Sequence, residues 1–482
     1  MSFMDINAAL NSFVWGPIML LLLVGTGVYF SISIGFPQFR HFIYVIKNTL
    51  GKIFQKTESA EGEMTPFQAV STALASTVGT GNIAGVTGAI VLGGPGAVFW
   101  MWISALFGMC TKFCEVTLAV RFRERDKKGD WVGGPMYYIK NGMGEKWKWL
   151  GMLFSLLAGL AAFGIGNMTQ INSITTQVKN VAQVYTADTL SPGTLGIISL
   201  VTSIIIALFV GFVVIGGIKR IGRVTETLVP FMALVYIICS FIVVFKNAAH
   251  VPAVFASIFE GAFSPQAAVG GIAGFTMLNA MQRGVARGVF SNEAGLGSAP
   301  MAHAATSETN PVRQGLYGIF EVFVDTIVVC TLTAFVVLSS GIMGTAVQYG
   351  DKAFADSSTT AMGFQTVFGD QIGSMILAVG LLMFATSTIL GWSLYGVRCA
   401  QFIFGDKAIK PYELIYCLII VVPAIFEISM GSADAISFVW DIADTMNGLM
   451  AIPNLIGLLI LSPVVIKLAR EFFSNIGKEE TA

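Results

Sequence analysis

Long apolar stretches alternate with short polar connections along almost the whole chain. A helix needs about 20 residues to cross about 30 Å of hydrocarbon, and eleven stretches reach that length. Helices satisfy their own backbone groups in lipid, and a spanning β-strand would need only about 9–11 residues. We therefore expect an all-α polytopic membrane protein. The eleven expected spans lie near residues 13–35, 66–92, 97–120, 149–185, 194–217, 224–246, 268–300, 311–340, 371–404, 412–430 and 447–469.

Two of these spans are interrupted by glycine and polar residues. The second contains ASTVGTGN at residues 75–82, and the seventh contains a glycine-rich run at residues 270–300. A single interruption is readily explained as a kink or a small-residue packing face. Two interrupted spans at corresponding positions of two halves instead indicate the substrate site of a secondary transporter. Because the two spans are an odd number apart, the halves are expected to insert in opposite orientations.

This reasoning predicts how the chain is divided. An extra N-terminal helix and a cytoplasmic linker come first, followed by two inverted repeats of five spans each and a cytoplasmic tail. Basic residues concentrate in alternate connections, above all in the segment 121–148, and positive charge is retained on the cytoplasmic side. We expect the N-terminus outside and the C-terminus inside. The four expected parts are residues 1–65, 66–250, 251–470 and 471–482.

The first interruption has the chemistry of a binding site. A half-helix that begins at Thr80 and Gly81 would present free N–H groups to a carboxylate. Carbonyls around Ala75 and Val78, at the end of the preceding half-helix, would be free to bind a hard cation. Because ASTVGTGN contains no acid, neutral oxygens favour sodium over a proton, which requires a titratable group.

Composition excludes several other classes of protein. The sequence is 55% hydrophobic and 12% charged, which excludes a soluble domain. Its 28 basic and 28 acidic residues balance, so charge gives no reason to expect a nucleic-acid partner. The six cysteines lie in or beside apolar runs, and no phosphate-binding GxxxxGK[ST] string occurs. A metal cluster, an ATP-driven pump and an intramembrane enzyme therefore have no support.

Charged residues inside the expected spans are interpreted separately. Lys112 and Glu115 are three residues apart on one helix and are expected to form an ion pair. Arg283 and Arg287, with Glu293, are expected to form either an intracellular gate or a plain structural pair. Glu321 and Asp325 share a helix face, and one of them would titrate if both are buried. This last pair is the basis of a proton-coupled alternative.

The string GGPGAVFWMWISALFG, at residues 93–108, resembles the signature of the alanine/glycine:cation symporter family. The resemblance continues through STVGTGNIAG, GVFSNEAGLGSAPMAHA and ATSTILGW, and covers residues 12 to about 463. It implies a LeuT-type fold of ten core helices preceded by one extra helix, in a prokaryotic cytoplasmic membrane. The implied function is import of alanine or glycine with sodium, without an organic cofactor or an obligatory protein partner. Another solute such as glutamine, or coupling to protons, remains an alternative.

The resemblance also implies roles for individual residues. Sodium would be bound by two carbonyls of the second span and by three residues of the ninth: Ala75, Val78, Ala385, Ser387 and Thr388. The substrate carboxylate would be held by Thr80 and Gly81, and its polar ends by Asn167 and Gln170. The wall of the pocket would be formed by Phe275, Thr276, Met277 and Trp392. A bulky wall of this kind would favour small side chains by exclusion.

Overall fold

The computed structural model describes residues 3–52, 63–186, 190–263, 277–430 and 437–479. Within these ranges nine helices are long and apolar enough to cross a membrane. A tenth candidate is a bent pair, Pro66–Thr77 and Thr80–Gly93, whose two parts meet at 58°. The all-α membrane architecture is therefore confirmed, whereas a count of eleven spans is not reached in the described part.

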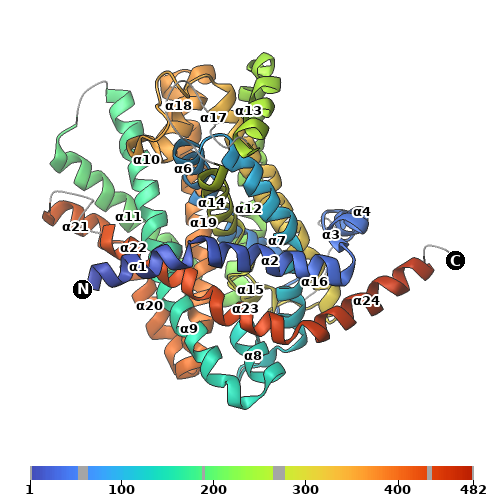
Figure 1. Ribbon diagram of the computed structural model, residues 1–482. Coiled ribbons are helices and arrows are strands. Elements are labelled where there is room, and N and C mark those ends of the chain that lie inside the picture. Colours follow the sequence, from blue (N-terminus) through green and yellow to red (C-terminus); the bar gives the residue numbers. More distant parts are fainter. Residues whose placement is uncertain (1–2, 53–62, 187–189, 264–276, 431–436, 480–482) are drawn as a thin grey trace.

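The N-terminal helices lead into the first interrupted span (Figure 1). Thr65 and Gln68 form a reciprocal capping box at the start of α5, where Pro66 takes the first helical position. The elements of this part are α1 (Phe3–Val14), α2 (Pro17–Ile34), α3 (Pro37–Arg40), α4 (Phe42–Asn48), η1 (Leu50–Lys52), α5 (Pro66–Thr77), η2 (Thr80–Asn82), α6 (Ala84–Gly93) and α7 (Gly96–Arg121).

A short antiparallel hairpin and four long helices follow. Glu124 pairs with Val132 and Arg125 with Trp131 in the hairpin. The π-helical turn η4 joins α9 to α10 without a break in the span. The elements are β1 (Glu124–Arg125), β2 (Trp131–Val132), α8 (Pro135–Met143), η3 (Glu145–Trp147), α9 (Lys148–Phe163), η4 (Gly164–Met168), α10 (Thr169–Thr186), α11 (Pro192–Val214) and α12 (Gly217–Lys246).

The next part contains the seventh and eighth expected spans. Asn310 caps α16, which opens with Pro311 and runs through the π-helical segment η6 into α17. The elements are η5 (Ala248–His250), α13 (Val251–Phe263), α14 (Met277–Asn292), α15 (Pro300–His303), α16 (Pro311–Val322), η6 (Phe323–Cys330) and α17 (Thr331–Ser339).

The C-terminal part differs from prediction at its end. The last apolar helical stretch runs from Val439 to Ile460 rather than over 447–469. The chain turns at Leu461 because Pro463 cannot continue the preceding helix. The elements are η7 (Lys352–Phe354), α18 (Ser357–Phe368), α19 (Asp370–Phe404), η8 (Asp406–Ala408), α20 (Ile409–Ile419), α21 (Val422–Met430), α22 (Ser437–Leu449), α23 (Ala451–Ile460) and α24 (Ser462–Glu479).

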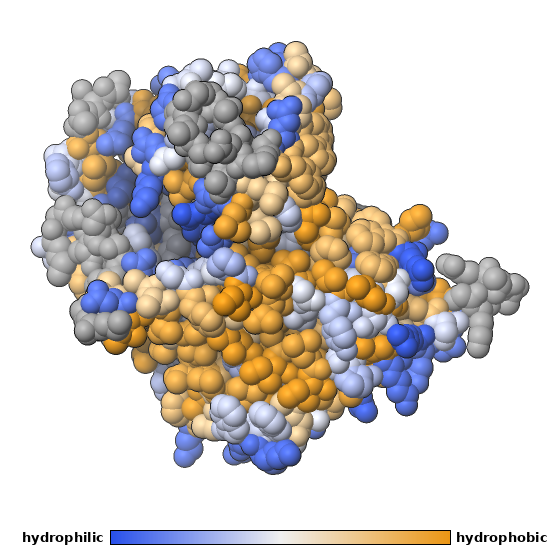
Figure 2. Space-filling view, viewed as in Figure 1, coloured by the Kyte–Doolittle hydropathy of each residue, from blue (hydrophilic) through white to orange (hydrophobic). Residues whose placement is uncertain are grey.

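Two groups of helices enclose the interrupted span. α7 packs against α14 and α16, while α19 packs against α5, α9, α10, α12 and α18. Leu21, Phe212 and Phe245 expose 74%, 68% and 74% of their surface, which is typical of lipid-facing positions. Apolar side chains accordingly cover much of the middle of the face seen in Figure 2.

The two ends of the molecule carry different elements. α8 lies at the lower end in Figure 1, which we call the basic end because α8 belongs to the segment 121–148. α13, α17 and α18 lie at the opposite end, which we call the distal end. α1 packs against α22, and α2 packs against α7, α23 and α24.

The separation of these two ends generates a test of orientation. Lys146 is exposed at the basic end and Lys352 is exposed between α17 and α18 at the distal end. In a variant without the native cysteines, we expect Lys352→Cys to react with a membrane-impermeant maleimide added to intact cells. Lys146→Cys should react after the membrane is permeabilised. Labelling of both positions from the same side would contradict the expected orientation.

Candidate functional site

The second expected span breaks at residues 78–83, where glycine and asparagine were clustered in the sequence. The Gly79 amide donates to Asn82 Oδ1 at 2.8 Å instead of extending α5. The Ala75 carbonyl is thereby released from the helix, and it accepts a hydrogen bond from the Ser387 hydroxyl at 3.3 Å. We call residues 78–83 the first break.

The predicted cation ligands on α5 and α19 lie against each other at this break. A side chain on Gly79 would have its Cβ 2.4 Å from Thr388 Oγ1, so glycine is required for the close approach of α19. Val78 ends α5 with a non-helical backbone. Ala385 is buried in α19, within one turn of Thr388. The structure therefore brings together the two segments that carry all five of these residues.

Of the two predicted polar contacts, Gln170 reaches the first break. Its Oε1 atom accepts from the Thr80 amide at 3.4 Å. Asn167 is instead directed toward α20, where its Nδ2 atom donates to the Tyr416 carbonyl at 2.8 Å. Asn167 lies in η4, and the wider π turn rotates it away from the face that carries Gln170.

A buried carboxylate supports the first break from the side. Asn82 Nδ2 donates to Asp325 Oδ1 at 2.6 Å, and the Ser291 hydroxyl donates to Asp325 Oδ2 at 2.9 Å. Glu321 has a different set of partners, Lys112 at 3.4 Å and His303 at 2.9 Å. Glu321 and Asp325 are both fully buried, as the proton-coupled alternative requires, but each has its own set of hydrogen-bond partners.

The break that the sequence predicts in the seventh span lies largely outside the described residues. Phe275 and Thr276 lie outside the described residues, and Met277 begins α14 with 40% of its surface exposed. Within the described residues the chain leaves α14 at residues 293–299, which we call the second break. Left-handed backbone occurs there at Glu293, Gly295 and Gly297, with φ of 55°, 89° and 86°. In the sequence, the string NEAGLGSAP, in which two spaced glycines precede a proline, marks this second break.

Two polar residues from distant helices hold the second break. The Gly295 amide donates to Glu115 Oε1 at 3.1 Å, and its carbonyl accepts from Asn454 Nδ2 at 2.8 Å. Asn454 Nδ2 also donates to Glu115 Oε1 at 2.6 Å. The expected ion pair between Lys112 and Glu115 is therefore wrong, because Glu115 binds the break while Lys112 pairs with Glu321.

Trp392 connects the second break to α9 and α10. Its indole N–H donates to Glu293 Oε1 at 3.1 Å, and its ring lies against the backbone of Gly166. The Trp392 side chain is 1% exposed. It therefore contacts one of the two breaks, in a packed position between helices.

A cavity of about 190 Å³, here called the central cavity, lies beside the first break. Thr80 and Gly81 line it together with Phe290, Arg283 and Arg287. The sequence analysis did not identify Phe290 as a site residue. Its ring nevertheless packs against Gly81, where a Cβ atom built on the glycine would lie 3.4 Å from it. An inner gate of Arg283, Arg287 and Glu293 is not formed, because the arginines line cavities near α6 while Glu293 binds Trp392.

At the basic end the two interrupted spans are tied together. The Met64 amide donates to the Ala305 carbonyl at 2.8 Å, and the Met64 carbonyl accepts from the Ser307 amide at 2.7 Å. Arg123 donates to the carbonyls of Ala304, Thr306 and Glu308 at 3.0, 2.6 and 2.9 Å. Burial lowers the pKa of Arg123 to about 10, so the guanidinium remains charged at neutral pH. These contacts hold the segment before α5 against the segment after α15.

The profile of the sodium:alanine symporter family matches residues 1–482. A protein named sodium/alanine symporter AgcS, from Methanococcus maripaludis, is 42% identical over 100% of this chain and 99% of its own length. A probable sodium/glutamine symporter from Bacillus subtilis is 36% identical over 96% and 90%. The crystal structure of MhsT with L-phenylalanine has a TM-score of 0.59 at 13% identity, covering 85% of this chain and 99% of that one. This last likeness concerns the fold, which is of LeuT type.

The hydrogen bonds that Glu115 accepts at the second break can be tested by their effect on the stability of the protein. Glu115→Ala removes the acceptor of two buried hydrogen bonds, and bonds to charged groups contribute about 1.5–3 kcal/mol each. We expect a clear fall in the melting temperature of the purified protein in detergent. Glu115→Gln keeps an acceptor oxygen and should lose less stability. Glu471→Ala, on the exposed face of α24, is the matched control, and an equal fall for that variant would contradict the assignment.

Proposed function

The chain belongs to the sodium:alanine symporter family, and we propose that it imports alanine or glycine together with sodium. One observation carries this proposal. Thr80 and Gly81 of the first break line the central cavity, directly beside the neutral oxygens of α5 and α19. A carboxylate and a small cation would thus bind at adjacent positions of the first break.

The carboxylate of the substrate would bind at the start of the second half-helix. Thr80 and Gly81 offer backbone N–H groups at the positive end of a helix dipole. Gln170 Oε1, which accepts from the Thr80 amide, would turn to the ammonium group once the carboxylate replaces it. The polar ends of an amino acid are then matched by groups from α10 and the first break.

Sodium would bind between α5 and α19. The carbonyls of Ala75, Val78 and Ala385 and the hydroxyls of Ser387 and Thr388 are neutral oxygen donors, which suit a hard monovalent ion. The Ser387 hydroxyl already lies against the Ala75 carbonyl, and Thr388 lies against Gly79. An ion at this place would join the first break to α19 and so organise the amides that receive the carboxylate.

Small substrates are favoured by the close approach of Phe290 to Gly81. The central cavity of about 190 Å³ is narrowed by this ring, so a longer side chain would have to displace it. Glutamine is the alternative substrate, because one relative carries the name of a probable sodium/glutamine symporter. The hydrogen bonds that join the two interrupted spans at the basic end, together with a cavity at the first break, are consistent with transport by alternating access.

Uptake measurements test the substrate and the coupling ion. In proteoliposomes that contain the purified protein, we expect radiolabelled alanine to accumulate only when a sodium gradient is imposed. Unlabelled alanine and glycine should compete more strongly than the other amino acids, each added in both enantiomers. Accumulation without sodium would contradict the coupling, and stronger competition by glutamine would contradict the substrate.

Substitutions test the proposed sodium site and the proposed carboxylate site separately. Thr388→Val removes an oxygen and should weaken the apparent sodium affinity by about tenfold, equivalent to about 1.4 kcal/mol, with a smaller effect on alanine. Thr80→Pro removes an N–H and should abolish alanine binding. Thr227→Val, at an exposed position of α12, is the control for the first substitution. If Thr388→Val affects alanine more than sodium, the assigned roles are wrong.

A further inference from the structure

A group of exposed basic and apolar side chains lies beside the end of the first span. α2 ends at Ile34, and Gly35 follows with the left-handed backbone of a helix C-cap, at φ of 87°. Pro37 then begins α3, so α3 and α4 come directly after an apolar helix that is long enough to cross a membrane. α24 packs against α2 and lies beside α4 (Figure 1). We call the group the lateral face, and its members are Phe39, Arg40, Ile43, Lys47 and Arg470.

The short helices α3 and α4 have an inner side and an outer side. On the inner side the His41 ring stacks on Phe473 of α24, with 4.4 Å between the ring centroids. On the outer side Phe39 and Ile43 expose 51% and 73% of their surface. Because the inner side is packed, the outer apolar side chains are held at the surface of the protein. Exposed apolar groups next to the end of a span are typical of contact with lipid.

Two guanidinium groups approach the last turn of α2 from different elements. Arg470 of α24 donates from Nε and Nη2 to the Ser33 carbonyl, at 3.1 and 2.6 Å. Arg40 of α3 lies beside the same turn, since a Cβ atom built on Gly35 would lie 3.4 Å from its Nη1 atom. Both arginines are exposed. Residues from opposite ends of the sequence therefore bring two positive charges to one place.

The positive charge of the lateral face has no acidic partner. Within the described ranges Arg40, Lys47 and Arg470 form no ion pair. Residues 6–57 include no aspartate or glutamate, and Glu471 pairs with a lysine of its own helix at 3.9 Å. Arginine presents a planar set of donors that matches a phosphate group. Unpaired arginines beside exposed apolar side chains are thus complementary to a lipid that carries a negative headgroup.

We propose that the lateral face binds the headgroup of an acidic phospholipid. The phosphate lies between Arg40 and Arg470, Lys47 adds longer-range attraction, and the acyl chains pack along Phe39 and Ile43. The end of α2 is expected on the cytoplasmic side, where acidic lipids give the leaflet a negative surface potential. The site is independent of the solute that the protein transports.

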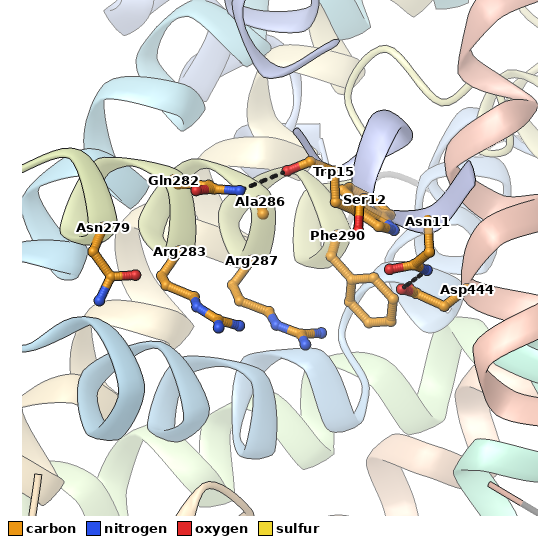
Figure 3. Close-up of a pocket in the computed structure, with 10 residues that line it drawn as sticks. All are labelled: Asn11, Ser12, Trp15, Asn279, Gln282, Arg283, Ala286, Arg287, Phe290 and Asp444. Atoms are coloured by element: carbon orange, nitrogen blue, oxygen red, sulfur yellow. Dashed lines mark hydrogen bonds between the residues drawn. The ribbon is translucent and has the colours of Figure 1, made fainter. Parts of the chain in front are cut away.

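The headgroup would fix one end of a span whose other end is already attached to the protein. The span Met4–Ile34 begins beside a cavity of about 270 Å³, which Asn11, Trp15 and Asp444 line (Figure 3). Asn11 donates to Asp444 Oδ2 at 3.0 Å, and Gln282 Nε2 donates to the Trp15 carbonyl at 3.4 Å. A lipid that joins α3 to α24 would therefore stabilise the packing of the whole span, so its binding can be measured by thermal unfolding.

Thermal unfolding of the full-length protein in detergent is the first test. We expect phosphatidylglycerol to raise the melting temperature more than phosphatidylcholine with the same acyl chains, and salt should reduce the difference. Arg40→Gln/Lys47→Gln should raise the concentration of phosphatidylglycerol that gives half of the effect by about tenfold or more. Both side chains are exposed, so the melting temperature without lipid should change little.

Controls separate a lipid site from general attraction between charges. Lys146→Gln/Lys148→Gln removes two exposed charges at the basic end and should leave the effect of phosphatidylglycerol unchanged. Ile43→Asn keeps every charge of the lateral face and should weaken the effect, because the acyl chains lose a contact. Glycerol phosphate, which has the phosphate without acyl chains, should not raise the melting temperature.

Native mass spectrometry provides the second measurement. After exposure to an equal mixture of the two lipids, the unsubstituted protein should retain phosphatidylglycerol in preference to phosphatidylcholine. Arg40→Gln/Arg470→Gln should lose this preference, whereas the lysine control should keep it.

Three results would overturn the proposal. The first is an unsubstituted protein that does not distinguish the two lipids, and the second is an equal loss of selectivity in the lysine control. The third is a full rise in melting temperature with glycerol phosphate. If the lateral face instead contacts a second copy of the chain, the arginine variants will change the mass measured by light scattering and keep the lipid effect, which also contradicts the proposal.

Discussion

A helix that is interrupted inside a membrane leaves backbone N–H and C=O groups that lipid cannot satisfy. Both breaks in this protein are therefore surrounded by side chains that supply the missing partners. Asn82, Gln170 and Ser387 serve the first break, while Glu115 and Asn454 serve the second. These residues come from helices far apart in the sequence. Their hydrogen bonds to a few backbone groups therefore connect α7, α10, α19 and α23 to the breaks.

The same constraint explains how a site can exist before any ligand binds. The Thr80 amide is occupied by Gln170 Oε1, and the Ala75 carbonyl is occupied by the Ser387 hydroxyl. A carboxylate or a cation that bound there would exchange one hydrogen-bond partner for another and leave no polar group without a partner. The second break is held differently, because Glu115 and Asn454 bind its backbone and each other. We infer that the first break is the place of exchange and the second is a fixed support.

Sequence patterns predicted the first break, but they did not identify the departure from helix at residues 293–299, for a physical reason. Gly79, Gly81 and Asn82 are clustered between regular apolar helices, so the interruption has clear limits. In the seventh span glycines are spread from residue 270 to 297, and glycine content alone does not distinguish a packing face from a break. The decisive feature is left-handed backbone at Glu293, Gly295 and Gly297, which becomes visible only in three dimensions. Lys112 was likewise predicted to pair with Glu115 on its own helix, because sequence spacing does not show that Glu321 of α16 is its partner in three dimensions.

The contacts of Arg123 have a consequence for movement at the basic end. One guanidinium donates to the carbonyls of three alternate residues after α15, and the same segment pairs with Met64 just before α5. Separation of the two interrupted spans at this end would break these hydrogen bonds, since each span supplies partners to the other. We infer that movement of one interrupted span at this end is coupled to movement of the other.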